Sequence, residues 1–405
     1  MGDAMGRMVE LEISNVAHGG VMVARDDGRV VFVADAIPGE LVRAVVTDDA
    51  KARFWRADTV EVLRPSEHRR PHVWSAAAIE RAPADRAGGA EFGHIELAHQ
   101  RELKRQVLDD ALRRMAGIES SITVEELPGP ADGTGWRTRV RLHAAEDGTL
   151  GPYAARSRNV IPVTDLPLAT PEVVAAAPLG KRAPGGVGIV APSEGDPWVL
   201  TAGSPRARIT ERVGEREFHL DVAGFWQVHR HAAETLTAAV QAAVDPGLFD
   251  PRAENLDLYG GVGLLAAALG DRFGEALRIT TVESDAAATD FAVENLAEWA
   301  GASAVTARVD RYLAQLVAAS GSDRTRLHGG TVVLDPPRSG AGKTVVAQLA
   351  ELGPSQVVYV ACDPVALARD LALFSERGYR LTGLRAFDLF PNTHHVEAVA
   401  SLVRA

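Results

Sequence analysis

The chain has 405 residues, 46% of them apolar, which suits a globular protein of about two or three domains with a large buried core. No basic N-terminal segment leads into a long apolar run, and no apolar run approaches the roughly 20 residues that a membrane-spanning helix needs. We therefore expect a soluble, cytoplasmic protein that has no membrane partner.

Charge and cysteine content exclude further classes of protein. The formal net charge of −11 argues against a protein that coats nucleic acid without sequence preference, although it allows a local basic patch. The single cysteine, Cys362, excludes an intramolecular disulfide and any zinc or iron–sulfur site built from several thiolates.

Residues 1–66 are predicted to form a small OB-like β-barrel, because short valine-rich runs alternate with turn residues. The predicted strands are Leu11–Val16, Val21–Ala24, Val30–Ala34, Leu41–Thr47 and Arg56–Leu63. Trp55 stands near the last strand beside Lys51, Arg53 and Arg56. Basic and aromatic residues together suit a nucleic-acid surface, but alone they favour a solvated strand with one packing tryptophan.

Residues 67–220 are predicted to form a central α+β domain. A helical spacing of apolar residues covers Ile95–Ala116, and strand-like runs cover Trp136–His143 and Val160–Val163. This region therefore separates the barrel from a third domain, residues 221–405.

In the third domain, strands and helices alternate regularly from about residue 254, which predicts a doubly wound α/β sheet. The predicted strands are Leu256–Tyr259, Arg278–Glu283, Val305–Val309, Thr331–Leu334 and Gln356–Ala361. The predicted helices are Leu264–Leu269, Ala286–Trp299, Tyr312–Ala318, Lys343–Leu352 and Val365–Arg377. Tyr379–Leu389 and Val396–Val403 then close the chain as a β-hairpin at the edge of the sheet.

A glycine-rich turn, residues 257–263, follows the first of these strands. Its glycines let the chain turn sharply and approach a ligand closely. Glu283 lies twenty residues beyond Gly263, where a carboxylate can accept hydrogen bonds from ribose hydroxyls. Both NAD and S-adenosylmethionine carry such a ribose, and Gly261–Ala266 fits the dinucleotide pattern G-x-G-x-x-A. The turn alone leaves both cofactors open.

Two further segments follow neighbouring strands and should meet at the carboxyl edge of the sheet. Asp335 opens the loop Asp335–Gly340, in which two prolines stiffen the chain. A dehydrogenase has no evident need of such a loop, so it favours a methyltransferase. Cys362 ends the next strand and precedes a helix whose N-terminal dipole favours a thiolate. This placement favours a reactive cysteine over a packing one.

The closing hairpin contains Phe390–Glu397, and Glu397 can return a carboxylate to the same edge. The adjacent His394 and His395 point to different faces of a strand, so we expect no metal site there. Uracil C5 is too weak a nucleophile to take a methyl group directly, whereas addition of a thiolate to C6 turns C5 into an enolate carbon. Cys362, Glu397 and the glycine turn supply the nucleophile, the base and the donor site that this chemistry needs.

These motifs resemble the RNA (uracil-5-)-methyltransferase family, which modifies tRNA and ribosomal RNA. The resemblance covers most of the chain and is strongest at the Asp335–Gly340 loop, at Cys362–Pro364 with Leu367–Leu371, and at Phe390–Pro391 with His395–Glu397. It implies a Rossmann-like class I S-adenosylmethionine-dependent domain at the C-terminus. The N-terminal barrel is similar to a TRAM domain, an RNA-binding OB-like module.

The resemblance also implies roles for individual residues. Cys362 would be the nucleophile and Glu397 the proton acceptor. The cofactor-binding positions would be Gln227, Tyr259, Glu283, Asp335 and, more weakly, Asp310. Gln227 belongs to Gly224–Val228, which resembles the entry into the catalytic domain, and Trp136–Arg139 resembles a central-domain motif. The implied partner is an rRNA or tRNA substrate, and nothing indicates an obligate protein partner.

The sequence departs from the family pattern at several positions. Many members carry four cysteines for a [4Fe–4S] cluster after the TRAM domain, whereas residues 68–93 contain none, so we expect no cluster. His229, Leu264 and Asp363 stand where asparagine is common. Two alternatives stay open, namely a Rossmann-type oxidoreductase that uses NAD and an RNA-binding relative without activity. Cytosine-C5 chemistry also uses a cysteine nucleophile, so uracil as the target base rests on the resemblance.

Overall fold

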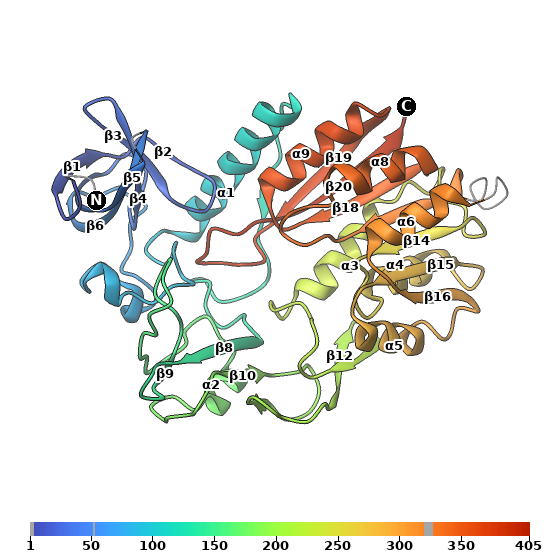
Figure 1. The fold of residues 1–405 in the computed structure, drawn as a ribbon, viewed down its shortest axis with the longest axis horizontal. Coiled ribbons are helices and arrows are strands. Elements are labelled where there is room, and N and C mark those ends of the chain that lie inside the picture. The colour runs from blue at the N-terminus through green and yellow to red at the C-terminus, as the bar shows by residue number, and fades with distance from the viewer. Residues whose placement is uncertain (1–3, 52, 320–326) are drawn as a thin grey trace.

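A computed structural model describes residues 4–51, 53–319 and 327–405. It shows a small β-barrel at the N-terminus, an irregular central part and a large α/β sheet with helices on both faces (Figure 1). No helix in the described residues is long and apolar enough to cross a membrane.

The N-terminal barrel consists of six strands in the order β1-β5-β6-β4-β3-β2. They are β1 (Met8–Glu12), β2 (Asn15–Val16), β3 (Met22–Asp26), β4 (Arg29–Ala34), β5 (Leu41–Lys51) and β6 (Phe54–Arg64). Burial alternates along β4 and β6, so Val31, Val33 and Trp55 face the barrel core. Phe32 and Arg56, which pair in register, stand on the outer face. The interpretation of Trp55 as a packing residue is therefore confirmed.

The central part contains one long helix and several short elements. They are η1 (Ser75–Ala77), η2 (Pro83–Asp85), α1 (Leu97–Ala111), η3 (Leu112–Ala116), β7 (Val124–Glu125), β8 (Arg139–Ala144), β9 (Leu150–Gly151), α2 (Pro171–Ala176), β10 (Val187–Val190), β11 (Trp198–Leu200), β12 (Arg208–Val213) and β13 (Arg216–Asp221). The prediction of a strand at Val160–Val163 is wrong. Only Val160 forms an isolated bridge, with Tyr153. Pro162 has no N–H to donate to a ladder there.

The C-terminal elements alternate as predicted. They are α3 (Ala232–Ala243), β14 (Asn255–Leu258), α4 (Leu264–Phe273), β15 (Arg278–Glu283), α5 (Ala286–Asn295), β16 (Gly301–Thr306), α6 (Val309–Ala318), β17 (Thr331–Leu334), α8 (Gly342–Leu352), β18 (Gln356–Ala361), α9 (Pro364–Ser375), β19 (Tyr379–Phe387) and β20 (Glu397–Arg404). The predicted strand Val305–Val309 is shifted, because Val309 already belongs to α6.

The large sheet has the order β16-β15-β14-β17-β18-β20-β19-β7. The first five strands are parallel, and β20 lies antiparallel between β18 and β19. The hairpin does not form the edge by itself, because the short β7 pairs with β19 beyond it. The chain order reverses between β14 and β17. At such a switch point the loops beyond the strands' carboxyl ends diverge and leave a crevice for a ligand.

Both faces of the sheet are covered by helices. One hydrophobic cluster joins the sheet to α6, α8, α9 and the end of α1, and the other joins it to α3, α4 and the end of α5. This two-sided burial explains why the central parallel strands β17 and β18 contain continuous apolar runs. The domain boundaries at residues 66 and 220 stay predictions.

Candidate active site

The glycine turn after β14 bends the chain away from the sheet. Tyr259, Gly261 and Gly263 have φ values of 62°, 54° and 91°, in the left-handed region that favours glycine. A Cβ at Gly260 would overlap the side chains of Thr281 and Asp257. A Cβ at Gly261 would meet nothing within 4 Å, so open space lies beside this backbone. The glycine turn therefore forms a concave stretch of exposed backbone, a cradle, that a ligand can approach closely.

Glu283 ends the neighbouring strand β15 beside this cradle. One of its carboxylate oxygens accepts the Gly261 N–H at 3.2 Å, and the other accepts the Ser284 hydroxyl at 3.0 Å and the Asp285 N–H at 2.8 Å. These bonds fix the half-buried carboxylate in place. Its remaining acceptor capacity is suited to ribose hydroxyls.

Asp310 lies in the first turn of α6, and its carboxylate pairs with Arg308 at 3.0 Å. The hydrogen bond from Arg308 holds the pKa of Asp310 below its usual range. Burial raises the pKa of Tyr259 to about 12, and the negative charge of Asp310 adds to this rise. The two side chains thus face the same region at the carboxyl ends of the strands.

Two carboxyl groups lie where β14 and β17 diverge. The Asp335 N–H donates to the Leu258 carbonyl at 3.2 Å, which holds the start of the Asp335–Gly340 loop against β14. Burial raises the pKa of Asp335 to about 7. Asp257 is fully buried, and burial raises its pKa to about 7 as well. One oxygen of Asp257 has no hydrogen-bond partner among the described residues. The crevice thus contains acidic groups that are partly neutral near pH 7.

Cys362 and Glu397 lie at adjacent strand ends. Ala361, the last residue of β18, pairs in register with Ala398 of β20. Cys362 follows Ala361 and Glu397 precedes Ala398, so the antiparallel register brings the two side chains to the same end of the sheet. Glu397 is buried, whereas Cys362 is half-buried. The structure therefore brings the predicted nucleophile and the predicted base together.

The resting state of Cys362 differs from the expectation of a thiolate. Burial raises the pKa of the Cys362 thiol to about 12, and the carboxyl groups of Glu397 and Asp335 raise it further than Arg338 lowers it. Burial and Asp335 also raise the pKa of Glu397 well above its usual value. The N-terminus of α9 is capped instead by Asp363, whose carboxylate accepts the Ala366 N–H at 2.8 Å.

Cys362 opens into a cavity of about 110 Å³. Besides Cys362–Pro364, its walls come from five separate parts of the chain: the β2–β3 turn of the barrel, Phe92, α1, the loop after β17 and the loop between β19 and β20. The side chains that sequence reasoning missed include His18, Lys104, Arg338 and His395. Arg338 donates to His395 at 3.2 Å, and only its place in the Asp335–Gly340 loop could have indicated it.

The barrel turn is fastened to the catalytic loops on both sides of Cys362. His18 forms a 2.8 Å ion pair with Asp363, the residue after the cysteine. Gly20 packs directly on His394, so a Cβ at Gly20 would overlap the histidine Cβ. The barrel thus completes the cavity, and Asp363 acts both as helix cap and as anchor for the turn.

Gln227 lies on a segment that the central part holds in place. The Arg139 guanidinium donates to the Gly224 carbonyl at 2.6 Å, and the Thr138 N–H donates to the Val228 carbonyl at 2.8 Å. His229 is buried and stacks on Trp136. The two motifs of the resemblance therefore pack together. Among the described residues, the structure records no hydrogen bond from Gln227 to the other predicted cofactor residues.

The remaining departure from the family pattern, Leu264, has a structural role. It begins α4 and packs in the hydrophobic cluster of its face of the sheet.

The rings of His394 and His395 lie 4.0 Å apart, centre to centre, and are tilted by 44°. No group of three metal-ligating side chains exists within the ranges that the structure describes.

Comparisons with known proteins agree with this architecture. The family model for tRNA (Uracil-5-)-methyltransferase matches residues 248–405, and the TRAM domain model matches residues 4–60. A protein of Streptomyces avermitilis named as an RNA methyltransferase is 37% identical over 98% of this chain and 98% of its own length. A 23S rRNA (uracil(1939)-C(5))-methyltransferase of Chromohalobacter salexigens is 31% identical over 97% of this chain and 89% of its own length.

The chain belongs to the RNA (uracil-5-)-methyltransferase family. The crystal structure of a Pyrococcus abyssi tRNA (uracil-54, C5)-methyltransferase in complex with S-adenosyl-L-homocysteine has the same fold, with a TM-score of 0.69. It is 20% identical and covers 98% of this chain and all of its own. The predicted family, the α/β fold and the TRAM barrel are confirmed, and the oxidoreductase alternative is wrong for this RNA (uracil-5-)-methyltransferase.

Proposed function

We propose that this protein methylates C5 of a uridine in rRNA or tRNA, in the cytoplasm, through a covalent bond between Cys362 and C6 of the base. Membership of the RNA (uracil-5-)-methyltransferase family supports the reaction. The observation that carries the covalent route is the placement of Cys362 and Glu397 at neighbouring strand ends, beside the Asp335 crevice.

S-adenosylmethionine fits the crevice as the methyl donor. The open space beside Gly261 admits a ligand against the backbone, and the fixed carboxylate of Glu283 is available for two ribose hydroxyls. We assign Tyr259, Asp310, Asp335 and Gln227 to the rest of the cofactor site. When bound, the cofactor supplies the electrophilic methyl group that C5 takes.

Cys362 and Glu397 perform the two remaining tasks. The Cys362 thiolate adds to C6 of uracil, which gives C5 the electron density of an enolate. After C5 has gained the methyl group, the Glu397 carboxylate removes the C5 proton, and the C6–S bond breaks to release the thiolate. The Arg338 cation interacts with the thiol and with the Glu397 carboxyl group, and it is suited to stabilise the negative charge of the enolate.

The target base must leave its stack to enter this cavity, so single-stranded or looped RNA is the expected substrate. The TRAM barrel supports RNA binding, since its β2–β3 turn forms one wall of the cavity.

The test uses an RNA transcript that contains 5-fluorouridine, together with S-adenosylmethionine. Fluorine cannot leave C5 as a cation, so Glu397 cannot complete the reaction and the Cys362–C6 bond persists. We expect a protein–RNA adduct that survives denaturing electrophoresis and contains the methyl group. The Cys362→Ala variant should bind the RNA and form no adduct.

The control reaction is methyl transfer to unmodified RNA from a bacterial strain that lacks 5-methyluridine. Full methyl transfer by Cys362→Ala would contradict the covalent route. RNA binding without methyl transfer by the unaltered protein would favour an inactive relative instead.

A further inference from the structure

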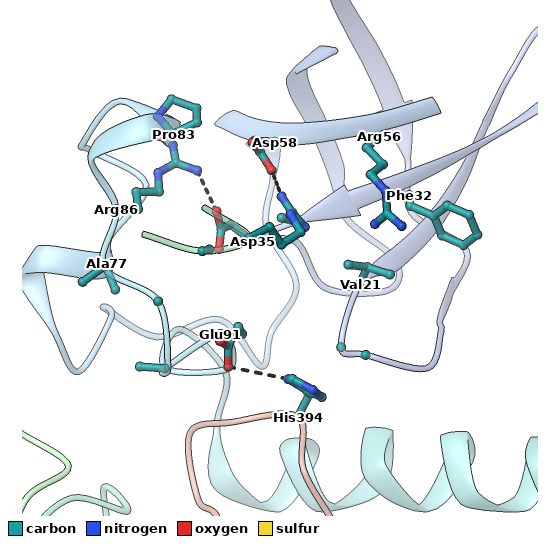
Figure 2. Close-up of a pocket in the computed structure, with 18 of the residues that line it drawn as sticks. Val21, Phe32, Asp35, Arg56, Asp58, Ala77, Pro83, Arg86, Glu91 and His394 are labelled. Atoms are coloured by element: carbon teal, nitrogen blue, oxygen red, sulfur yellow. Dashed lines mark hydrogen bonds and ion pairs between the residues drawn. The ribbon is translucent and has the colours of Figure 1, made fainter. Parts of the chain in front are cut away.

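A second cavity, of about 350 Å³, lies beyond the barrel turn that closes the catalytic cavity. Figure 2 shows it between the outer face of β4 and β6, the chain around Ala77–Glu91 and the loop that carries His394. The two cavities share His18, Gly19, Gly20 and His394. They are therefore neighbours, separated by the close contact between Gly20 and His394.

Most charged groups around this second cavity are already paired. Arg86 binds Asp35 at 2.6 Å, Arg156 binds Asp58, and His394 lies 3.6 Å from Glu91 (Figure 2). These pairs neutralise the carboxylates, which would otherwise repel a phosphate group.

Arg56 is the arginine of this cavity with the weakest carboxylate contact. Its nearest recorded carboxylate partner, Asp48, is 4.0 Å away, which is the longest ion pair of any arginine that lines the cavity within the described residues. Arg56 can therefore exchange this long, exposed ion pair for a contact with an anionic group that enters the cavity.

A planar aromatic ring lies beside this cation. Phe32 and Arg56 pair in register on β4 and β6, and the guanidinium lies 5.9 Å from the centre of the ring. Both side chains are half-buried and line the cavity, and Figure 2 shows the Phe32 ring at its outer edge beside Arg56. An aromatic face beside a cation suits a nucleic-acid base that stacks while its phosphate meets the cation.

We propose that this cavity binds the nucleotide next to the target uridine in single-stranded RNA, with its base against Phe32 and its phosphate at Arg56. The inference rests on the proposed function, because the uracil must occupy the neighbouring catalytic cavity. The RNA chain would pass over the turn His18–Gly20 from one cavity to the other.

The experiment compares uridine monophosphate with the trinucleotide UpUpU in competition against a fluorescent oligouridylate, using the full chain. A stacked neighbour with its phosphate should make UpUpU bind about tenfold more tightly than the monophosphate. Arg56→Ala should remove that gain, and so should Phe32→Leu, which keeps an apolar side chain but loses the planar ring. Binding of the monophosphate should stay unchanged in both variants.

Arg64→Ala is the matched control. Arg64 lies on the same strand, pairs with Glu12 on the exposed surface and does not line the cavity. Its removal changes the net charge equally, so the trinucleotide should keep its gain in affinity. Equal losses in Arg56→Ala and Arg64→Ala would overturn the proposal, as would equal affinities of the unaltered protein for the two ligands.

Methyl transfer separates this inference from the proposed function. With unmodified bulk RNA, Arg56→Ala should raise KM about tenfold and leave kcat unchanged, since the reacting groups lie in the other cavity. If Arg56→Ala transfers methyl groups with an unaltered KM, the second cavity does not bind the neighbouring nucleotide, whereas the proposed function is unaffected. Failure of methyl transfer by the unaltered protein would refute the proposed function. The trinucleotide comparison would then still test whether the second cavity binds a neighbouring nucleotide.

Discussion

At the scale of single residues, the candidate site is marked by acidic groups and a thiol with raised pKa values. Burial raises the pKa of Cys362, Asp335 and Glu397 together, and each negative charge that forms there raises the cost of the next. A thiol with a pKa of about 12 is almost fully protonated at neutral pH. On the proposed route, Cys362 must therefore lose its proton in the complex with substrate.

The reactivity of Cys362 should respond to its two charged neighbours in opposite directions. Glu397, once ionised, carries a negative charge that raises the thiol pKa, so Glu397→Gln should leave more thiolate at pH 9 and iodoacetamide should react several-fold faster there. Arg338→Ala removes the opposing cation and should slow the reaction. Mass spectrometry reports the site directly, because Cys362 is the only cysteine. Glu376→Gln, at the end of α9, is the control and should match the unaltered protein. A slower reaction in Glu397→Gln would contradict this electrostatic assignment.

The rate of methyl transfer should rise with pH and should not pass through a maximum near neutral pH. The reaction needs Cys362 as thiolate and Glu397 as carboxylate, and both pKa values are raised, so both active forms gain population as the pH rises. We expect kcat/KM, which reports the free enzyme, to rise between pH 6 and pH 9, by about tenfold per pH unit where one of the two groups is protonated and by up to about a hundredfold where both are. Initial rates of methyl transfer in buffers of constant ionic strength measure this. A maximum near pH 6 would show that a different group supplies the base.

At the scale of elements, the barrel turn is the part of the site that no local pattern indicates. Asp335 and Cys362 follow parallel strands of one sheet, and Glu397 begins the antiparallel strand β20, so the sheet edge and the closing hairpin were enough to bring the three together. His18 and Lys104 come from the barrel and from α1, and only the packing of these elements places them beside Cys362. Sequence reasoning therefore indicated the candidate reacting groups and missed the walls of the cavity beside Cys362.

The elements themselves were predicted unevenly for a related reason. Strands buried on both faces, such as β17 and β18, contain short apolar runs and were predicted at their observed bounds. The two-residue β7 was missed because its stability comes from a partner, β19, far along the chain. Local periodicity carries no information about such pairing.

Gly20 offers a direct test of the barrel turn. In Gly20→Ala the new methyl group would overlap the Cβ of His394, which cannot rotate away, so the turn must withdraw from the catalytic loops. A displacement of this kind near reacting groups can cost about a hundredfold in rate, and we expect a fall in kcat/KM of about ten- to a hundredfold.

The matched control is Gly28→Ala in the β3–β4 turn of the same barrel. Gly28 has a similar φ of 82°, against 75° for Gly20, and a Cβ there would meet nothing within 4 Å. Both variants carry the same backbone strain, but only Gly20→Ala has the overlap. Equal methyl-transfer rates in the two variants would show that the contact with His394 has no catalytic importance.

At the scale of the whole molecule, the loop between β19 and β20 joins the catalytic sheet to the other parts of the chain (Figure 1). The ammonium group of Lys104, on α1, donates to Asp388 at 2.5 Å, and both side chains are buried. Figure 1 also shows α1 between the barrel and the sheet. The loop that carries His395 is thus fixed from outside its own domain.

Asn392 is the centre of this connection. Its side-chain oxygen accepts from Arg70 at 2.6 Å and from Gln100 at 3.0 Å, while its amide group donates to the carbonyls of Asp132 at 3.0 Å and Gly133 at 2.8 Å. The residue is fully buried, and its φ of 66° lies where asparagine is tolerated better than most side chains. One side chain therefore joins three segments that are distant in the sequence.

Asn392→Ala should destabilise the protein more than the small number of atoms removed suggests. Four hydrogen bonds disappear, buried partners on three segments lose their contacts, and alanine is strained at positive φ, so we expect a loss of about 3–5 kcal/mol in the free energy of unfolding. Urea unfolding followed by tryptophan fluorescence measures this. Asn15→Ala is the control, because Asn15 is exposed and its side chain bonds only to the neighbouring Val16 N–H among the described residues. Loss of the Asn392 hydrogen bonds should also displace His395. The Asn392→Ala variant should therefore show reduced methyl transfer under conditions where the protein is still folded. An unfolding midpoint equal to that of Asn15→Ala would mean that the three parts of the chain hold together without this residue.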